Sequence, residues 1–165
     1  MAFGAAALLS ARHSLGAQSE PSAIEYRAWV GGGVGGAGKS GLTAVQWEAW
    51  VSRGSLGLGY QGSTTDPIAK TTQSAHGLLV GAILARRRVL GRVAAGAVSA
   101  RSCLKEGEQA GNESCTSRVA PEFSVSLDGL LGPTFAIHTS YFKIPSGSVG
   151  HSAFVFGLLI GRLGR

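Results

Sequence analysis

The 165-residue sequence is poor in charge. Charged residues make up 15% of the chain, against about 25% in an average soluble domain. This scarcity, together with 44% hydrophobic residues, excludes a disordered tail, which needs high charge and few apolar side chains. The sequence also lacks any apolar run of the ~20 residues that a membrane-spanning helix requires. It has no Gly-X-Y period, which excludes collagen, and its 26 glycines are too dense for a coiled coil.

The charges that are present are mainly basic, with 15 Lys and Arg against nine Asp and Glu. Apart from Arg86, Arg87 and Arg88, they are scattered and have no aromatic stacking motif beside them, so we expect no nucleic-acid partner. The two cysteines, Cys103 and Cys115, flank a polar, loop-like segment. This arrangement predicts a disulfide formed in an oxidising compartment, the alternative being two unrelated thiols.

The first 18 residues predict a targeting segment. An apolar run followed by small residues resembles the back half of a secretory signal peptide. The charged region that should precede the apolar run is missing. We therefore expect a truncated signal peptide over residues 1–18 and one folded domain over residues 19–165.

From residue 23 onward, apolar and small or polar residues alternate with a period of two, which is typical of half-buried strands. The clearest case places Phe123, Val125 and Leu127 on one face, with Ser124 and Ser126 on the other. Three segments are apolar on both faces, near 75–85, 88–100 and 151–162. For these segments the pattern does not decide which face points inward. The eight predicted strands cover about 23–35, 43–52, 55–61, 75–85, 88–100, 122–131, 135–141 and 151–162.

The connections between these segments alternate in length. Long connections fall near 36–41, 63–74, 101–120 and 145–150, and short ones near 53–54, 86–87 and 132–133. An antiparallel barrel with both termini on one side produces this alternation, with short periplasmic turns and longer outer loops. We therefore expect the cysteine pair in the longest outer loop.

Alternation alone does not separate a membrane barrel from a soluble, lipocalin-like one. Here the polar faces are mostly Gly, Ala and Ser, unlike the Lys- and Glu-rich surface that favours solubility. Aromatic residues on the apolar faces lie near predicted strand ends, which indicates interfacial girdles. These residues are Tyr26, Tyr60, Phe123, Phe135, Tyr141 and Phe154.

On this pattern, residues 23–165 resemble the small eight-stranded outer-membrane barrels of the OmpA and OmpX type. The predicted fold is all-β, an eight-stranded antiparallel up-and-down transmembrane β-barrel in a bacterial outer membrane. We expect a monomer with a non-enzymatic structural or surface-interaction role, without cofactor or metal. Its partners would be membrane lipids, lipopolysaccharide or external proteins. Basic residues in or beside the outer loops suit lipid phosphates, namely Lys39, Lys70, Arg101, Lys105, Arg118 and Lys143.

A barrel of this size is filled by side chains. The inward charges are predicted to be Glu25, Arg27, Glu48, Arg92 and Asp128. Buried charges must be paired, so we expect a structural ion-pair network that leaves the barrel closed or barely conductive; a proton or ion path is the alternative.

Two motifs indicate other functions. Residues 33–40 satisfy the P-loop pattern and resemble the start of a Ras-like GTPase, which would imply a cytosolic nucleotide-binding protein. Residues 137–154 are similar to the last-hairpin region of the lipid A deacylase PagL. That resemblance implies an ester hydrolase with His138 as base and Ser140 as nucleophile; the alternative is a polar inward pair.

Overall fold

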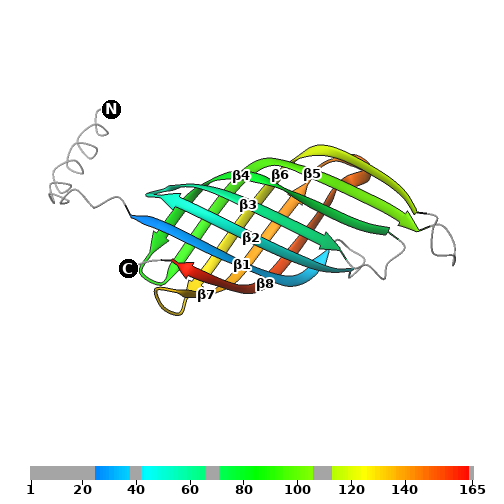
Figure 1. Cartoon of the computed structure of the whole chain (residues 1–165). Helices are drawn as coiled ribbons and strands as arrows, with labels where there is room; N and C mark the ends of the chain where they lie inside the picture. The colour runs from blue at the N-terminus through cyan, green and yellow to red at the C-terminus, as the bar shows by residue number, and fades with distance from the viewer. Residues whose placement is uncertain (1–24, 38–41, 66–70, 106–112, 164–165) are drawn as a thin grey trace, which may run out of the picture.

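A computed structural model describes residues 25–37, 42–65, 71–105 and 113–163. Eight strands pair in sequence order, each antiparallel to its neighbours, and β8 returns to β1 to close a barrel (Figure 1). The predicted all-β fold class is therefore confirmed. The elements are β1 (Tyr26–Ala37), β2 (Leu42–Arg53), β3 (Leu56–Thr65), β4 (Thr71–Arg86), β5 (Val89–Lys105), β6 (Glu113–Leu130), β7 (Phe135–Ile144), the 3-10 turn η2 (Gly147–Val149) and β8 (His151–Arg162).

The two ends of the barrel differ. One end, here called the turn end, carries residues 54–55, 87–88 and 131–134 together with the start of β1 and the end of β8 (Figure 1). The opposite end, the loop end, carries the other four connections. The expected placement of both ends of the barrel domain on one side is confirmed. Residues 1–24, which include the predicted signal peptide, lie outside the described residues.

The alternation of side chains places polar residues inside and apolar residues outside. Along β6, Ser124, Ser126 and Asp128 are buried, while Val125 and Leu127 are exposed. The same parity holds along β1, β2, β3 and β7. Because apolar side chains face outward and polar ones inward, the outer wall suits a hydrocarbon solvent.

Three strands line the interior with apolar side chains, which explains why their inward face could not be read from the sequence. Leu79 of β4, Val98 of β5, and Val155 and Leu159 of β8 are buried. Their outward neighbours are equally apolar, so both faces carry the same chemical signature. β4, β5 and β8 thus contribute mostly apolar side chains to the interior, with Arg92 of β5 as the charged exception.

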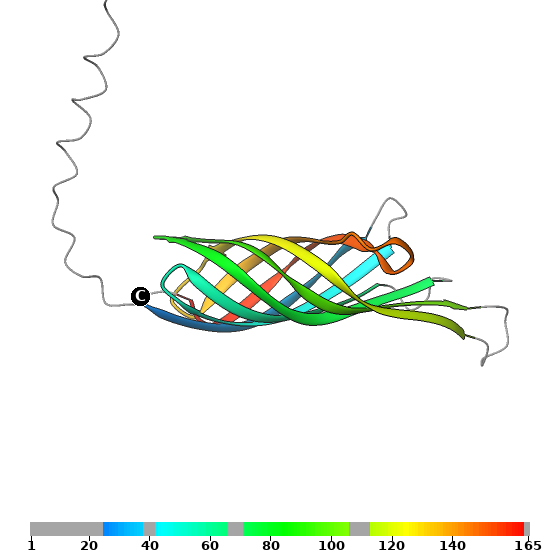
Figure 2. The same cartoon turned by 90° about the horizontal axis from the view of Figure 1, so that it is seen from above.

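Several strands are longer than the sequence pattern predicts, and three of them exceed it most. β4, β5 and β6 have 16, 17 and 18 residues, and the predicted loop over 101–120 is mostly strand. The outer part of β6 (113–122) has no β7 partner and pairs only with β5, while β4 pairs with the other edge of β5 as far as Leu104. This extension beyond the loop end (Figure 2) is called the β5–β6 ribbon below. The sequence pattern predicts a loop here because this part of the chain lacks an apolar face, but strands outside the membrane do not require one.

Four of the six aromatic positions lie near strand ends as expected, whereas Phe123 lies mid-strand because β6 begins at Glu113. Tyr26 and Phe135 lie at the turn end, and the cross-strand neighbours Tyr141 and Phe154 lie toward the loop end. Tyr60, expected near a strand end, lies mid-strand because β3 continues to Thr65. Two aromatic levels thus flank an apolar band, as in outer-membrane barrels.

Candidate functional site

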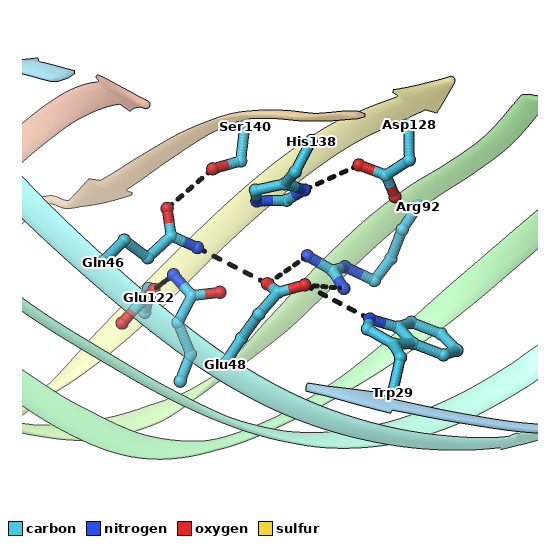
Figure 3. Close-up of polar contacts among 9 residues, drawn as sticks. Trp29, Gln46, Glu48, Arg92, Glu122, Asp128, His138 and Ser140 are labelled. Atoms are coloured by element: carbon cyan, nitrogen blue, oxygen red, sulfur yellow. Dashed lines mark hydrogen bonds and ion pairs between the residues drawn. The ribbon is translucent and has the colours of Figure 1, made fainter. Parts of the chain in front are cut away.

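An ion pair between Glu48 and Arg92 crosses the barrel interior (Figure 3). Glu48 lies on β2 and Arg92 on β5, strands that are not neighbours in the sheet. Both guanidinium nitrogens donate to the carboxylate, at 2.9 and 2.6 Å, and both side chains are fully buried. Trp29 adds a third donor through its indole nitrogen at 3.3 Å. The two charges are paired and hydrogen-bonded, the condition under which burial of ions is tolerated.

Aromatic rings complete the surroundings of the guanidinium. The Arg92 guanidinium carbon lies 4.2 Å from the ring centroid of Trp50. Trp50 stacks on Trp29, with centroids 6.2 Å apart and planes at 15°. A cation over an indole face is attracted by the ring quadrupole, and the attraction strengthens when water is excluded. Arg92 is therefore held in one position by a carboxylate on one side and an indole on another.

A second polar group lies between β6 and β7. Asp128 and His138 are directly opposite one another in the sheet, and His138 Nδ1 is 2.6 Å from Asp128 Oδ1. The Ser140 hydroxyl donates to Gln46 of β2 across the interior, at 2.6 Å. Figure 3 shows these contacts beside the ion pair. Gln46 also donates weakly to Glu48, at 3.5 Å, so the two groups are joined.

Further polar contacts extend toward both ends. Near the turn end, Arg27 pairs with Glu25 and donates to the Gly54 carbonyl oxygen. Toward the loop end, Gln61 of β3 donates to Glu122 of β6 across the interior. Like Glu48 with Arg92, this contact joins strands that are not neighbours.

The five charges predicted to face inward fall into three contacts. The structure brings Glu48 to Arg92 and Glu25 to Arg27, while Asp128 contacts His138 instead of a cation. Sequence reasoning did not select Gln61, Glu122 or the stacked tryptophans for this network. Parity was the available signal, since Glu122 and Trp50 share the inward face with neighbours that were selected.

The chemistry available to His138 and Ser140 follows from their burial. They are 0% and 1% exposed, respectively, and both point into the interior. Among the described contacts, none joins the imidazole to the Ser140 hydroxyl, which instead donates to Gln46. Neither group reaches the outward surface, where an acyl ester of a membrane lipid would lie.

The P-loop interpretation is wrong. Residues 33–37 belong to β1 and pair with both β2 and β8. A P-loop requires a helix after the glycine-rich segment, but the next described element is the antiparallel strand β2. Residues 38–41 lie outside the described residues. No helix in the described part of the chain is long and apolar enough to cross a membrane.

The cysteine pair has a different setting from the one expected. Cys103 and Cys115 form a disulfide between directly paired residues of β5 and β6, in the ribbon and not in a loop. The exposed Arg101 side chain lies against it, with Nε and a terminal nitrogen 3.1 and 3.2 Å from the two sulfurs. The disulfide therefore fastens the two strands of the ribbon beyond the barrel wall.

Apolar layers close the interior on both sides of the polar network. Toward the turn end lie Ile83, Leu90 and Leu163, and toward the loop end lie Phe142 and Val155. Within the described ranges, no group of three or more His, Cys, Asp or Glu residues has metal-site geometry. The arrangement is that of a filled core, in which Glu48 and Arg92 neutralise one another and Glu122 is hydrogen-bonded to the Gln61 amide.

No protein-family model and no curated protein sequence matches the chain. Solved structures do. Neisserial surface protein A has a TM-score of 0.62 at 10% identity, with 84% of this chain and 97% of the other covered. The N-terminal barrel domain of Pseudomonas aeruginosa OprF gives 0.65 at 7%, covering 82% and 96%. Ail of Yersinia pestis, the attachment invasion locus protein, gives 0.60 at 12%, covering 84% and 98%.

The chain has the fold of an integral outer-membrane β-barrel. Low sequence identity means that this likeness concerns the fold, and the apolar outer wall agrees with it. The turn end of the outer-membrane barrel is therefore the periplasmic end, because short turns face the periplasm in this class. The loop end, with the disulfide-fastened ribbon, faces the exterior.

Proposed function

We propose that this outer-membrane barrel serves as an anchor whose loop end contacts lipopolysaccharide or external partners, without an enzymatic step. The observation that carries the proposal is a contrast within one molecule. The interior is filled by the Glu48–Arg92 pair and by apolar layers, whereas the β5–β6 ribbon extends beyond the wall. The strands are longest at the loop end, and the filled interior leaves no wide channel for solutes.

The loop end is basic where the structure describes it. Arg101 and Arg118 are exposed on the ribbon, and Lys143 is exposed near the end of β7. Lys143 also borders a cavity of about 420 Å³ with His151 and Gln73. Lys39 and Lys70 lie outside the described residues. Cations at this level suit the phosphates of lipopolysaccharide, each contact contributing about 1 kcal/mol.

A structural neighbour offers a parallel. Ail was solved in complex with the heparin analogue sucrose octasulfate, and that structure has a TM-score of 0.58 to this chain at 12% identity. A polysulfated sugar and a phosphorylated lipid share dense negative charge. The exposed basic residues of the ribbon support the same class of ligand for this chain.

The test compares binding of lipopolysaccharide to the folded barrel and to charge variants. We expect Lys143→Gln and Arg101→Gln each to weaken binding about fivefold, which corresponds to ~1 kcal/mol per contact. Arg87→Gln is the matched control, because it removes an equal charge at the periplasmic end. Equal affinities for wild type, loop-end variants and control would contradict a loop-end contact.

The lipid A hydrolase alternative has no support from the geometry of His138 and Ser140. We expect His138→Ala to leave the lipid A of producing cells unchanged, since the imidazole is buried beside Asp128. Mass spectrometry of lipid A measures this directly. Loss of an acyl chain in cells with the wild-type barrel, absent in cells with the variant, would restore the hydrolase.

A further inference from the structure

The lipid-facing wall formed by β1, β2 and β3 is hollowed. One hollow of about 530 Å³ lies beside Ala28 and Ala49. A second, of about 400 Å³, reaches Tyr26 and Arg53 at the periplasmic end. The two hollows are adjacent, since Val51 and Leu58 line both. The two together, lined by Tyr26, Ala28, Ala49, Val51, Arg53 and Leu58, are called the β1–β3 groove below.

The groove has a sequence cause. Its floor is made where the outward positions carry alanine, at Ala28 opposite Val51 and at Ala49 opposite Tyr60. The larger neighbours Val51 and Leu58 stand out from the wall and are 57% and 49% exposed. A methyl group beside a branched or aromatic side chain leaves a depression in the wall. The lining is almost wholly apolar and suits a hydrocarbon chain.

A cation stands at the periplasmic mouth of the groove. Arg53 is exposed, and its guanidinium carbon lies 5.6 Å from the centre of the Tyr26 ring. The nearby carboxylate of Glu25 is occupied by Arg27. In the described part of the chain, no carboxylate pairs with Arg53. The aromatic ring therefore holds an uncompensated positive charge where apolar wall meets water, the level of lipid headgroups.

The groove is short enough along the strands to lie within one leaflet of the bilayer. Arg53 and Ala49 are four residues apart on β2, which is about 13 Å along the strand. The hydrocarbon core of a bilayer is ~30 Å thick, so the groove stays within the half that adjoins the periplasmic end. In an outer membrane, that leaflet is made of glycerophospholipids.

We infer that the β1–β3 groove binds one glycerophospholipid of the periplasmic leaflet. An acyl chain lies over Ala28 and Ala49, and the phosphodiester contacts the Arg53 guanidinium. A second barrel is a poorer occupant, because the same cation would then meet its own copy or an apolar wall. The groove lies at the end opposite the ribbon, so a test of phospholipid binding there is independent of a test of lipopolysaccharide binding.

Native mass spectrometry of the folded barrel, released from vesicles containing phosphatidylglycerol, tests the site. We expect one phospholipid to remain bound to the wild type. Arg53→Gln should lower its occupancy about fivefold, the value of one cation–phosphate contact. Ala49→Leu should lower it further by filling the groove. The matched controls are Arg87→Gln at the same end and Ala95→Leu on the outward face of β5.

A second measurement, the quenching of tryptophan fluorescence, detects lipid in the groove itself. Trp29 and Trp50 border it from the inside, whereas Trp47 faces outward. In a Trp47→Phe background, phosphatidylglycerol with brominated acyl chains should quench the two remaining tryptophans, and Ala49→Leu should reduce that quenching. Equal lipid retention by all variants, retention of a second barrel instead of a lipid, or quenching unchanged by Ala49→Leu would each overturn the inference.

Discussion

At the scale of single residues, the buried ion pair of Glu48 and Arg92 is the contact on which the stability of the interior depends most. Its partners lie 44 positions apart in the sequence, and each is enclosed by indole rings and amides. A buried ion pair need not add net stability over apolar residues. Removal of one partner, however, leaves an unpaired charge in a dry interior, at a cost of about 3–5 kcal/mol.

We therefore expect Glu48→Gln to lower the free energy of unfolding by about 3–5 kcal/mol, because Arg92 then remains buried without its carboxylate. Adding Arg92→Met to that variant should recover most of the loss. Urea unfolding of the barrel in phospholipid vesicles measures both. The control is Glu25→Gln, whose partner Arg27 lies at the periplasmic mouth; a loss there as large as at Glu48 would contradict the special role of the central pair.

The residues of the network were only partly predictable. Alternation identified Glu48 and Asp128 as inward, because each is flanked by outward apolar residues. It could not choose their partners, since closure of the barrel decides which strands face one another across the interior. For that reason the contact of Glu122 with Gln61 is not predictable from the sequence. The contact of His138 with Asp128 depends instead on the register between the neighbouring strands β6 and β7.

At the scale of elements, the β5–β6 ribbon is the feature that departs most from the sequence expectation. Strand segments with a lipid-facing side can be recognised in the sequence because apolar and polar residues alternate, as in residues 122–131. The outer parts of β5 and β6 have water on their sides, so polar residues such as Ser117 and Arg118 occupy both faces. Their backbone pairing, of β6 with β5 and of β5 with β4, defines them as strands without an apolar face.

The disulfide should act on this ribbon alone. Replacing both Cys103 and Cys115 with alanine removes a cross-link that stabilises the ribbon against local opening by roughly 3 kcal/mol in the chain-entropy model. We expect faster tryptic cleavage at Arg101 and Arg118 on the surface of intact cells. The urea midpoint of the barrel should not change, because the membrane-spanning parts of the strands keep their partners. A lowered midpoint with unchanged cleavage would contradict this division.

At the scale of the whole molecule, the barrel has three parts with separate tasks. A filled interior fixes the strands, an apolar outer wall with two aromatic levels holds the molecule in the bilayer, and a basic loop end meets the exterior. The fold does not select a ligand, because barrels of one architecture serve different roles. We propose that ligand selection comes from the loop end and from the β1–β3 groove.

The electrophoretic mobility of the detergent-extracted protein, unboiled against boiled, tests the central claim most directly. A closed barrel with a continuous strand ladder and a paired interior resists unfolding by detergent until it is heated. We predict two mobilities for protein taken from the outer-membrane fraction, one before and one after boiling. A single mobility under both conditions, with the protein in the soluble fraction, would contradict a lipid-embedded barrel.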